Sequence, residues 1–175
     1  MVRRLAMVAV SAVFVSPLLV AGVRPLVRAE SPQAPTRAEI DAFVKQAIED
    51  RFAAKNIPDF NLLGPGTKIT IREEMPAARM RLGKDALPER PGYEFYLISQ
   101  AATQQQADTT QRELSFIAVD GPSITGETAV ISLGVDVTFP TDPKIAKLCC
   151  CTGRGEFRRV NGRWTFVKWA DMICS

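Results

Sequence analysis

Four cysteines are the residues of this 175-residue chain whose type and spacing most directly suggest chemistry. Cys149, Cys150 and Cys151 are consecutive, and Cys174 is the penultimate residue. Neighbouring thiols form disulfides in an oxidising compartment, and as thiolates they bind metal ions. The chain contains no histidine, the commonest general base and zinc ligand. This absence excludes Ser-His-Asp and Cys-His catalysis and histidine-dependent iron sites for the isolated chain.

A predicted C-terminal hairpin determines which cysteines can meet. Asn161-Gly162 is the strongest short signal for a two-residue hairpin turn. This turn places Phe157 opposite Phe166, and Arg159 opposite Trp164 as a cation–π pair across the strands. The hairpin therefore predicts a defined register for the last quarter of the chain.

The same register, continued without interruption, places Cys149 opposite Cys174 at a non-hydrogen-bonded position. Cα atoms lie about 4.5 Å apart at such positions, within the roughly 4.4–6.8 Å that a disulfide allows. A bulge at Gly153 or Gly155 would shift the register by one residue and could place Cys150 or Cys151 opposite Cys174 instead. We expect Cys174 to bond one member of the run, with Cys149 as first choice. Closing this loop would add about 3 kcal/mol in the chain-entropy model.

The two remaining cysteines have three open fates: a vicinal disulfide, free thiols, or a bridge between chains. In a strand, Cys150 points away from the side chains of Cys149 and Cys151. A copper or zinc site would therefore need the run to leave strand geometry, so we expect no metal and no cofactor.

The first 29 residues have the layout of a signal peptide. Arg3 and Arg4 precede an almost continuous apolar run over 5–23, and Val27-Arg28-Ala29 fits the small-residue cleavage pattern. An uncleaved anchor is the alternative, because an apolar run of this length can span a bilayer. We expect an exported protein, periplasmic or extracellular, with membrane attachment only if the leader is retained.

Charge follows the same division of the chain. The whole sequence has 22 Lys+Arg and 19 Asp+Glu, but four of the arginines and no acidic residue lie in residues 1–29. The remainder carries one more acidic than basic side chain. It therefore offers no global electrostatic reason to bind nucleic acid.

For the chain after the leader, the sequence predicts a flexible, proline-rich entry segment at 30–35 and a single α+β domain over 36–175. Thr36 and Glu39 have capping-box spacing, and an apolar stripe predicts a helix over 37–55. Residues 128–139 alternate apolar and polar side chains, which is typical of an antiparallel strand with one buried face. The other predicted elements are strands at 67–72, 93–99 and 113–119, a helical turn near 77–82, and a mobile loop at 100–111, where Ala and Gln would also tolerate a helix. The predicted fold is an N-terminal helix on a curved antiparallel sheet that ends in a β-hairpin.

The closing segment Gly155–Trp169, a strand, a glycine turn and an Arg-Trp-x-apolar strand, resembles the nuclear-transport-factor-2-like superfamily. Ketosteroid-isomerase-like and polyketide-cyclase-like proteins belong to this group. The resemblance covers residues 112–170, and the segment that begins at Gly126 is similar to the group's penultimate strand. It implies a cone-shaped α+β fold with a pocket between sheet and helices, and it makes a homodimer one expected assembly.

The resemblance also suggests one catalytic arrangement. Asp136 with Tyr93 or Tyr96 could form the carboxylate and phenol pair of isomerase-like chemistry, in which the carboxylate abstracts a proton and the phenol stabilises the enolate. Asp136 lies on the polar face of its strand, where a solvated aspartate is the ordinary occupant. The preferred hypothesis is therefore a non-catalytic module that binds a protein partner or a small-molecule ligand. A small isomerase- or cyclase-like enzyme and a thiol- or metal-handling protein are the alternatives.

Overall fold

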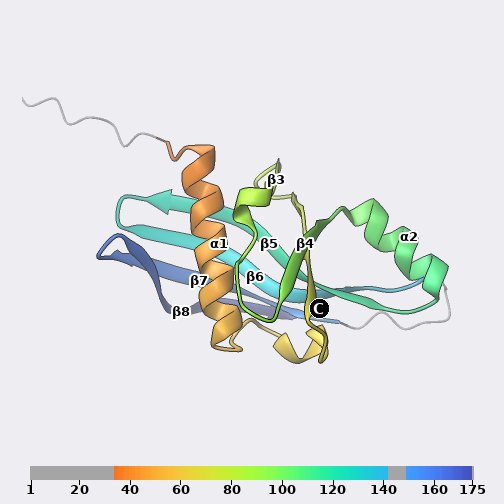
Figure 1. Ribbon diagram of the computed structural model, residues 1–175. Coiled ribbons are helices and arrows are strands. Elements are labelled where there is room, and N and C mark those ends of the chain that lie inside the picture. The colour runs from red at the N-terminus through yellow and green to blue at the C-terminus, as the bar shows by residue number, and fades with distance from the viewer. Residues whose placement is uncertain (1–33, 142–148, 175) are drawn as a thin grey trace, which may run out of the picture. The chain divides into compact units, whose positions relative to one another are not determined.

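The computed structural model describes residues 34–141 and 149–174, which belong to one compact unit (Figure 1). The predicted leader and most of the entry segment lie outside the described residues. The elements are α1 (Arg37–Ala53), η1 (Phe60–Leu63), β1 (Lys68–Arg72), β2 (Glu74–Met75), β3 (Met80–Arg81), η2 (Lys84–Ala86), β4 (Glu94–Ile98), α2 (Gln100–Thr110), β5 (Leu114–Thr125), β6 (Thr128–Thr138), β7 (Cys151–Val160) and β8 (Arg163–Cys174). No helix among the described residues is long and apolar enough to cross a membrane.

Helix α1 forms where the sequence predicts it. The Thr36 hydroxyl accepts a hydrogen bond from the Glu39 amide at 3.3 Å, and the Glu39 carboxylate accepts one from the Thr36 amide at 2.7 Å. Together these bonds complete the capping box. The bonds from the backbone and the hydroxyl of Thr36 hold the pKa of Glu39 below its usual range. The apolar stripe of the helix is buried against one face of the sheet, where Phe43 meets Phe157 and Trp164 edge-on.

The sheet has six strands in the order β4-β1-β5-β6-β7-β8. The α+β class is confirmed, but the sheet is mixed rather than wholly antiparallel, because β1 pairs in parallel with β4 and with β5. The alternation predicted for 128–139 is confirmed in β6, whose buried residues include Ala129, Ile131, Leu133 and Val135. Strand β5 does not end at Asp120: it bulges at the following residues, where Gly121 has φ of +54°, and continues to Thr125.

Two local predictions are wrong. The segment expected as a mobile loop at 100–111 is helix α2, because Ser99 caps it by accepting a bond from the Ala102 amide at 3.1 Å. Thr103 and Ala107 anchor this helix as its buried residues. The helical turn expected near 77–82 is absent: these residues form part of the turn of the small β2–β3 hairpin and its second strand, β3.

The β7–β8 hairpin keeps the predicted register only near its turn. Phe157 faces Phe166 and Arg159 faces Trp164, with the Arg159 guanidinium carbon 4.4 Å from the centroid of the Trp164 ring. Beyond Phe157 the pairing shifts twice, and each shift leaves one β8 residue, Val167 and then Ala170, without a cross-strand partner.

These two shifts correct the cysteine prediction. Cys151, not Cys149, faces Cys174 and forms a disulfide with it, and the two Cα atoms lie 4.0 Å apart. The alternative register, slipped by bulging, is therefore the one observed. The extra residues, Val167 and Ala170, lie in β8, whereas the bulge was expected at a glycine of β7. Cys149 pairs with Cys150, the vicinal arrangement among the three open fates.

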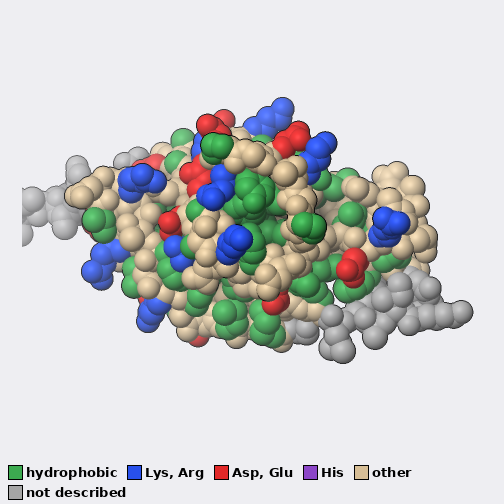
Figure 2. Space-filling model, turned by 60° about the horizontal axis from the view of Figure 1, so that its bottom comes forward, with side chains coloured by type: hydrophobic (Ala, Val, Ile, Leu, Met, Phe, Trp, Pro, Cys, Tyr) green, Lys and Arg blue, Asp and Glu red, His purple; other side chains and the backbone are tan. Residues whose placement is uncertain are grey.

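Figure 2 shows one face of the molecule. Apolar side chains gather near its middle, and Lys and Arg side chains lie among Asp and Glu side chains around them. Charges of opposite sign are interspersed on this face, so it has no broad field of one sign.

Candidate functional site

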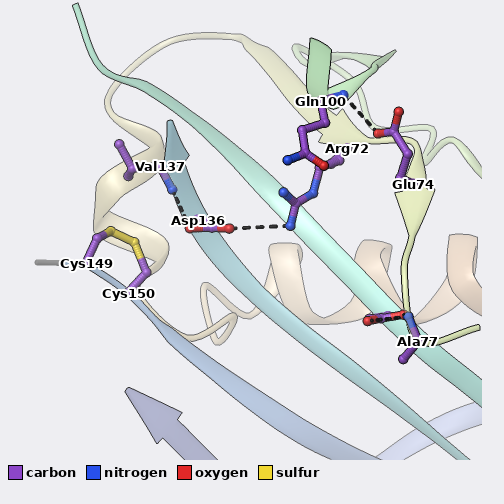
Figure 3. A network of polar contacts seen from close by, with 9 residues as sticks. Arg72, Glu74, Ala77, Gln100, Asp136, Val137, Cys149 and Cys150 are labelled. Atoms are coloured by element: carbon purple, nitrogen blue, oxygen red, sulfur yellow. Dashed lines mark hydrogen bonds and ion pairs between the residues drawn. A yellow bond between two sulfur atoms is a disulfide. The ribbon is translucent and has the colours of Figure 1, made fainter. Parts of the chain in front are cut away.

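Three residues that the sequence singled out separately come together on the face of the sheet opposite α1. Possible metal-ligand atoms of Asp136, Cys149 and Cys150 all lie within 4.8 Å of one another. Figure 3 shows Asp136 between the Val137 amide and Arg72, with the Cys149–Cys150 pair beside it. All three side chains are partly buried. The site thus combines a side chain of β6, near the middle of the sheet, with two residues that directly precede β7.

The cysteine pair reaches Asp136 because β7 begins abruptly. The last pair that β7 forms with β6 is Gly134 with Thr152, and the next β6 amide, of Val135, donates to the carbonyl of Pro58 at 3.0 Å. The Cys151 amide donates to a carboxylate oxygen of Asp59. Cys149 and Cys150, which precede β7, therefore form no backbone pair with β6.

Backbone conformation completes this turn away from the sheet. Cys150 has φ of +94°, in the left-handed region that non-glycine residues rarely adopt. Its side chain consequently escapes the strand alternation that would point it away from Cys149. Non-glycine residues with such conformations concentrate at functional sites, where the surrounding structure holds the strain.

Gly134 permits the close approach of the two strands. A Cβ atom at this position would lie 2.5 Å from the Cys151 carbonyl oxygen and 3.1 Å from Thr152 Cα. No side chain fits that space without moving backbone. A glycine inside a strand pattern is typical of close backbone approach, but this signal, which was not among the sequence predictions, marks a crowded position and not the residues that meet there.

Arg72, at the end of β1, is the functional side chain that the sequence reasoning missed. Its guanidinium carbon lies 4.8 Å from the centroid of the Phe116 ring, and Nη2 donates to Asp136 Oδ2 at 3.4 Å. Its Nε is buried and has no hydrogen-bond partner among the described residues. Arginine presents five N–H donors, so this guanidinium has unused donor capacity.

Arg72 and Asp136 line a hollow of about 280 Å³ on the face of the sheet. Asp120 also lines it, but its carboxylate is already occupied by the amides of Ala77 at 3.0 Å and Gly121 at 2.8 Å. Asp120 therefore fastens the β2–β3 turn to β5. The other residues of the lining are Pro76, Ala77, Ala118, Val119, Gly121, Ser132 and Thr152. The lining combines apolar side chains and hydroxyl groups with the Arg72–Asp136 ion pair, whose guanidinium keeps unused donors.

The structure does not bring the predicted tyrosines to Asp136. Tyr93 packs edge-on against Phe52, with ring centroids 4.9 Å apart, in a separate hollow near η1. Tyr96 lines another hollow with Glu73 and Leu82. The carboxylate and phenol pair is therefore not formed, and Asp136 has Arg72 as its charged neighbour instead.

Two larger hollows among the described residues have different linings. The one that contains Tyr96 measures about 550 Å³, but its acidic residue Glu73 is held by Arg81. The other, of about 380 Å³, is lined by the capping-box residues Thr36 and Glu39, whose polar groups bind each other. The Arg72–Asp136 hollow differs from these two because a buried guanidinium nitrogen in its lining, Arg72 Nε, has no hydrogen-bond partner among the described residues.

Comparisons with known proteins add no assignment: no family model, no curated protein and no solved structure matches this chain. The class that fold and site define is therefore an α+β domain with a mixed sheet, two cysteine pairs, and a polar hollow beside one of them.

Proposed function

We propose that this chain is an exported, non-catalytic binding domain that takes a small polar ligand into the Arg72–Asp136 hollow. The observation that carries the proposal is the guanidinium of Arg72. Among the described residues it has one hydrogen-bond acceptor, at 3.4 Å, and it lies over an aromatic ring at the edge of a hollow. Such a group is suited to an anionic oxygen on the ligand, because charge-assisted bonds to guanidinium are the strong ones.

The remainder of the lining limits the ligand class. Asp136 can accept from a hydroxyl or ammonium group, and Ser132 and Thr152 add hydroxyl groups. Pro76 and Ala118 offer apolar contact. The volume of about 280 Å³ suits a molecule at the small end of the range that protein pockets hold. A small carboxylate that also carries hydroxyl or amino groups fits this chemistry.

The test uses the Arg side-chain resonances in ¹⁵N NMR spectra, with pyruvate, succinate and phosphate as anionic probes and glycerol and ethanolamine as controls. At least one anionic probe should shift the Arg72 Nε–H resonance saturably. Arg72→Gln should weaken that binding about tenfold or more, because a hydrogen bond to a charged group contributes about 1.5–3 kcal/mol. Arg112→Gln, at an exposed position outside the hollow, is the matched control and should bind as the unaltered protein does. Equal binding by the two variants, or no shift with any anionic probe, would refute the proposal.

Export belongs to the same proposal. Residues 1–29 would be removed after Ala29, and the domain would act in the periplasm or outside the cell, where disulfides persist. Intact mass of the exported protein, measured with and without alkylation under non-reducing conditions, tests both points. The expected mass lacks the leader and shows no alkylated thiol.

Kinship with the nuclear-transport-factor-2-like superfamily is also kept as a proposal. It rests on the closing hairpin and on a helix packed against a curved sheet. The isomerase-like alternative has no supporting observation, because neither tyrosine reaches Asp136.

A further inference from the structure

The cysteine pair beside the hollow carries a second chemistry that organic ligand binding does not use. Asp136, Cys149 and Cys150 offer three ligand atoms within 4.8 Å of one another. From this cluster we infer that the dithiol form of Cys149 and Cys150, together with Asp136, binds one thiophilic divalent cation of the Zn²⁺ class.

The ligand set matches that cation class. Thiolates select soft and borderline metals, and zinc takes Cys and Asp ligands in tetrahedral sites. Three protein ligands leave a fourth position for water, the open arrangement of reactive rather than structural zinc sites. In a strand, the side chains of Cys149 and Cys150 would point to opposite faces and could not bind one ion. Here they can, because Cys150 has φ of +94° and its side chain turns toward Cys149.

Asp136 is held in place by groups that leave it able to coordinate. Its Oδ1 accepts from the Val137 amide at 2.8 Å, and its Oδ2 accepts from Arg72 at 3.4 Å. Each carboxylate oxygen has two acceptor positions, so one remains on each for a metal ion. Hydrogen bonds of this kind orient a ligating carboxylate and are part of a working metal site (Figure 3).

The electron and proton balance is simple. A dithiol reductant gives two electrons and two protons to the Cys149–Cys150 disulfide, which becomes two thiols while the reductant becomes a disulfide. The divalent ion then displaces both thiol protons as it binds. A disulfide oxidant reverses the sequence: it takes two electrons from the metal-bound thiolates and two protons from solvent to become a dithiol, the Cys149–Cys150 bond re-forms, and the ion is released. The site therefore responds to the thiol redox state of its compartment.

The second disulfide allows the first to open without loss of the fold. Cys151–Cys174 joins residues 23 positions apart and closes the open end of the hairpin, whereas Cys149–Cys150 joins adjacent residues. In the chain-entropy model, closure of the long loop contributes most of the stability and closure between adjacent residues contributes much less. The Cys151 amide also keeps its bond to Asp59, which holds the start of β7 whatever the state of the vicinal pair.

This inference does not depend on the organic ligand proposed above. Both proposals use Asp136, but the metal site requires the thiolates of the reduced cysteine pair, whereas the organic ligand requires Arg72 and can bind in either redox state. Arg72→Gln removes one of the two bonds that orient Asp136 and so disturbs both sites. In contrast, Cys149→Ser leaves Arg72 and Asp136 in place and should weaken metal binding while anion binding is unchanged.

The experiment titrates the purified protein with Co²⁺ under anaerobic conditions after graded reduction with dithiothreitol. Reduction that frees Cys149 and Cys150, as shown by alkylation and peptide mapping, should precede reduction of Cys151–Cys174. One Co²⁺ per chain should then give thiolate-to-metal charge-transfer absorption, and Zn²⁺ should displace it with no further proton release. The oxidised protein should give no such absorption.

Matched variants identify the ligands. Cys149→Ser should weaken Co²⁺ binding at least about a hundredfold, and Asp136→Asn about tenfold, the scale on which a lost ligand or its support lowers metal affinity. Asp171→Asn removes an exposed carboxylate of β8 outside the cluster and should change affinity less than twofold. Bound metal should also protect Cys149 and Cys150 from alkylation.

Three outcomes would overturn the inference. The first is a Co²⁺ affinity that Cys149→Ser leaves unchanged. The second is equal affinity of Asp136→Asn and Asp171→Asn. The third is metal protection of Cys151 and Cys174 in place of Cys149 and Cys150. If Cys149→Ser fails to fold, the protection pattern in the unaltered protein decides between the two cysteine pairs.

Discussion

At its turn, the β7–β8 hairpin follows the register that Asn161-Gly162 dictates, whereas at its open end β8 lies two residues out of that register. Both turn residues have positive φ, +51° for Asn161 and +78° for Gly162, as a two-residue hairpin turn requires. Local backbone chemistry is sufficient to set the pairs nearest the turn.

At the open end of the hairpin, side-chain packing determines the register instead. Strict alternation from Phe166, which faces Phe157, would direct Lys168 to the core face and Trp169 outward. The extra residue Val167 reverses this: Lys168 faces Glu156, and Trp169 packs against the core. Gly153 and Gly155 lack a Cβ and leave room for the Trp169 ring. The comparison teaches that a turn sets register only until burial of a large side chain outweighs an unbroken ladder.

The largest expected effect comes from breaking the open end. Replacing both Cys151 and Cys174 by serine should lower the free energy of unfolding by about 3 kcal/mol, because the long loop is no longer closed in the unfolded chain. Replacing Cys149 and Cys150 by serine is the matched control. Urea unfolding under non-reducing conditions should show a much smaller loss in the control, about 1 kcal/mol, and equal losses would contradict the assigned pairing.

An intermediate effect is expected where the two registers meet. Gly153→Ala adds a Cβ that would lie 2.7 Å from Trp169 Cε3, so the ring or the strand must move. Overpacking of this kind costs about 1–3 kcal/mol. Gly66→Ala, which adds a Cβ with nothing within 4 Å, should leave stability nearly unchanged. Thermal unfolding followed by tryptophan fluorescence measures both variants, and a Gly153→Ala protein as stable as the control would show that Trp169 does not fill this space.

The smallest effect is expected near the turn. Arg159→Ala removes the guanidinium 4.4 Å from the Trp164 ring centroid and should cost about 0.5–1 kcal/mol. Arg158→Ala, at the exposed neighbouring position, is the control and should cost less. Urea unfolding compares the two, and a larger loss for Arg158→Ala would mean that the cation–π contact does not stabilise the turn.

The sequence correctly predicted the structural features that depend on residues close together along the chain. The capping box of α1, the alternation of β6 and the Asn-Gly turn each involve residues a few positions apart, and each is observed. Helix α2 was missed although Ser99 is a standard cap, because its polar composition hid the two buried positions. The signal for the shifted hairpin was also present, since Lys168 followed by Trp169 contradicts strict alternation.

The candidate site was harder to foresee because it joins distant segments. Asp136 and the cysteine run were named from sequence, but nothing local indicated that they meet, or that Arg72 from β1 would join them. Their meeting depends on the parallel pairing of β1 and on the bond from Cys151 to Asp59. Such contacts follow from the assembled sheet and not from any stretch of sequence.

The two unpaired residues of β8 have a consequence for how the protein behaves at high concentration. β8 is an edge strand, and it exposes Val167, Met172 and Ile173. A straight apolar edge of this length would be a template on which another polypeptide could add a strand and begin to aggregate. Interruptions at Val167 and Ala170 bend that edge and break the even spacing of its free amides and carbonyls. We therefore expect the irregularity that packs Trp169 against the core to make edge-to-edge association of the molecules less favourable.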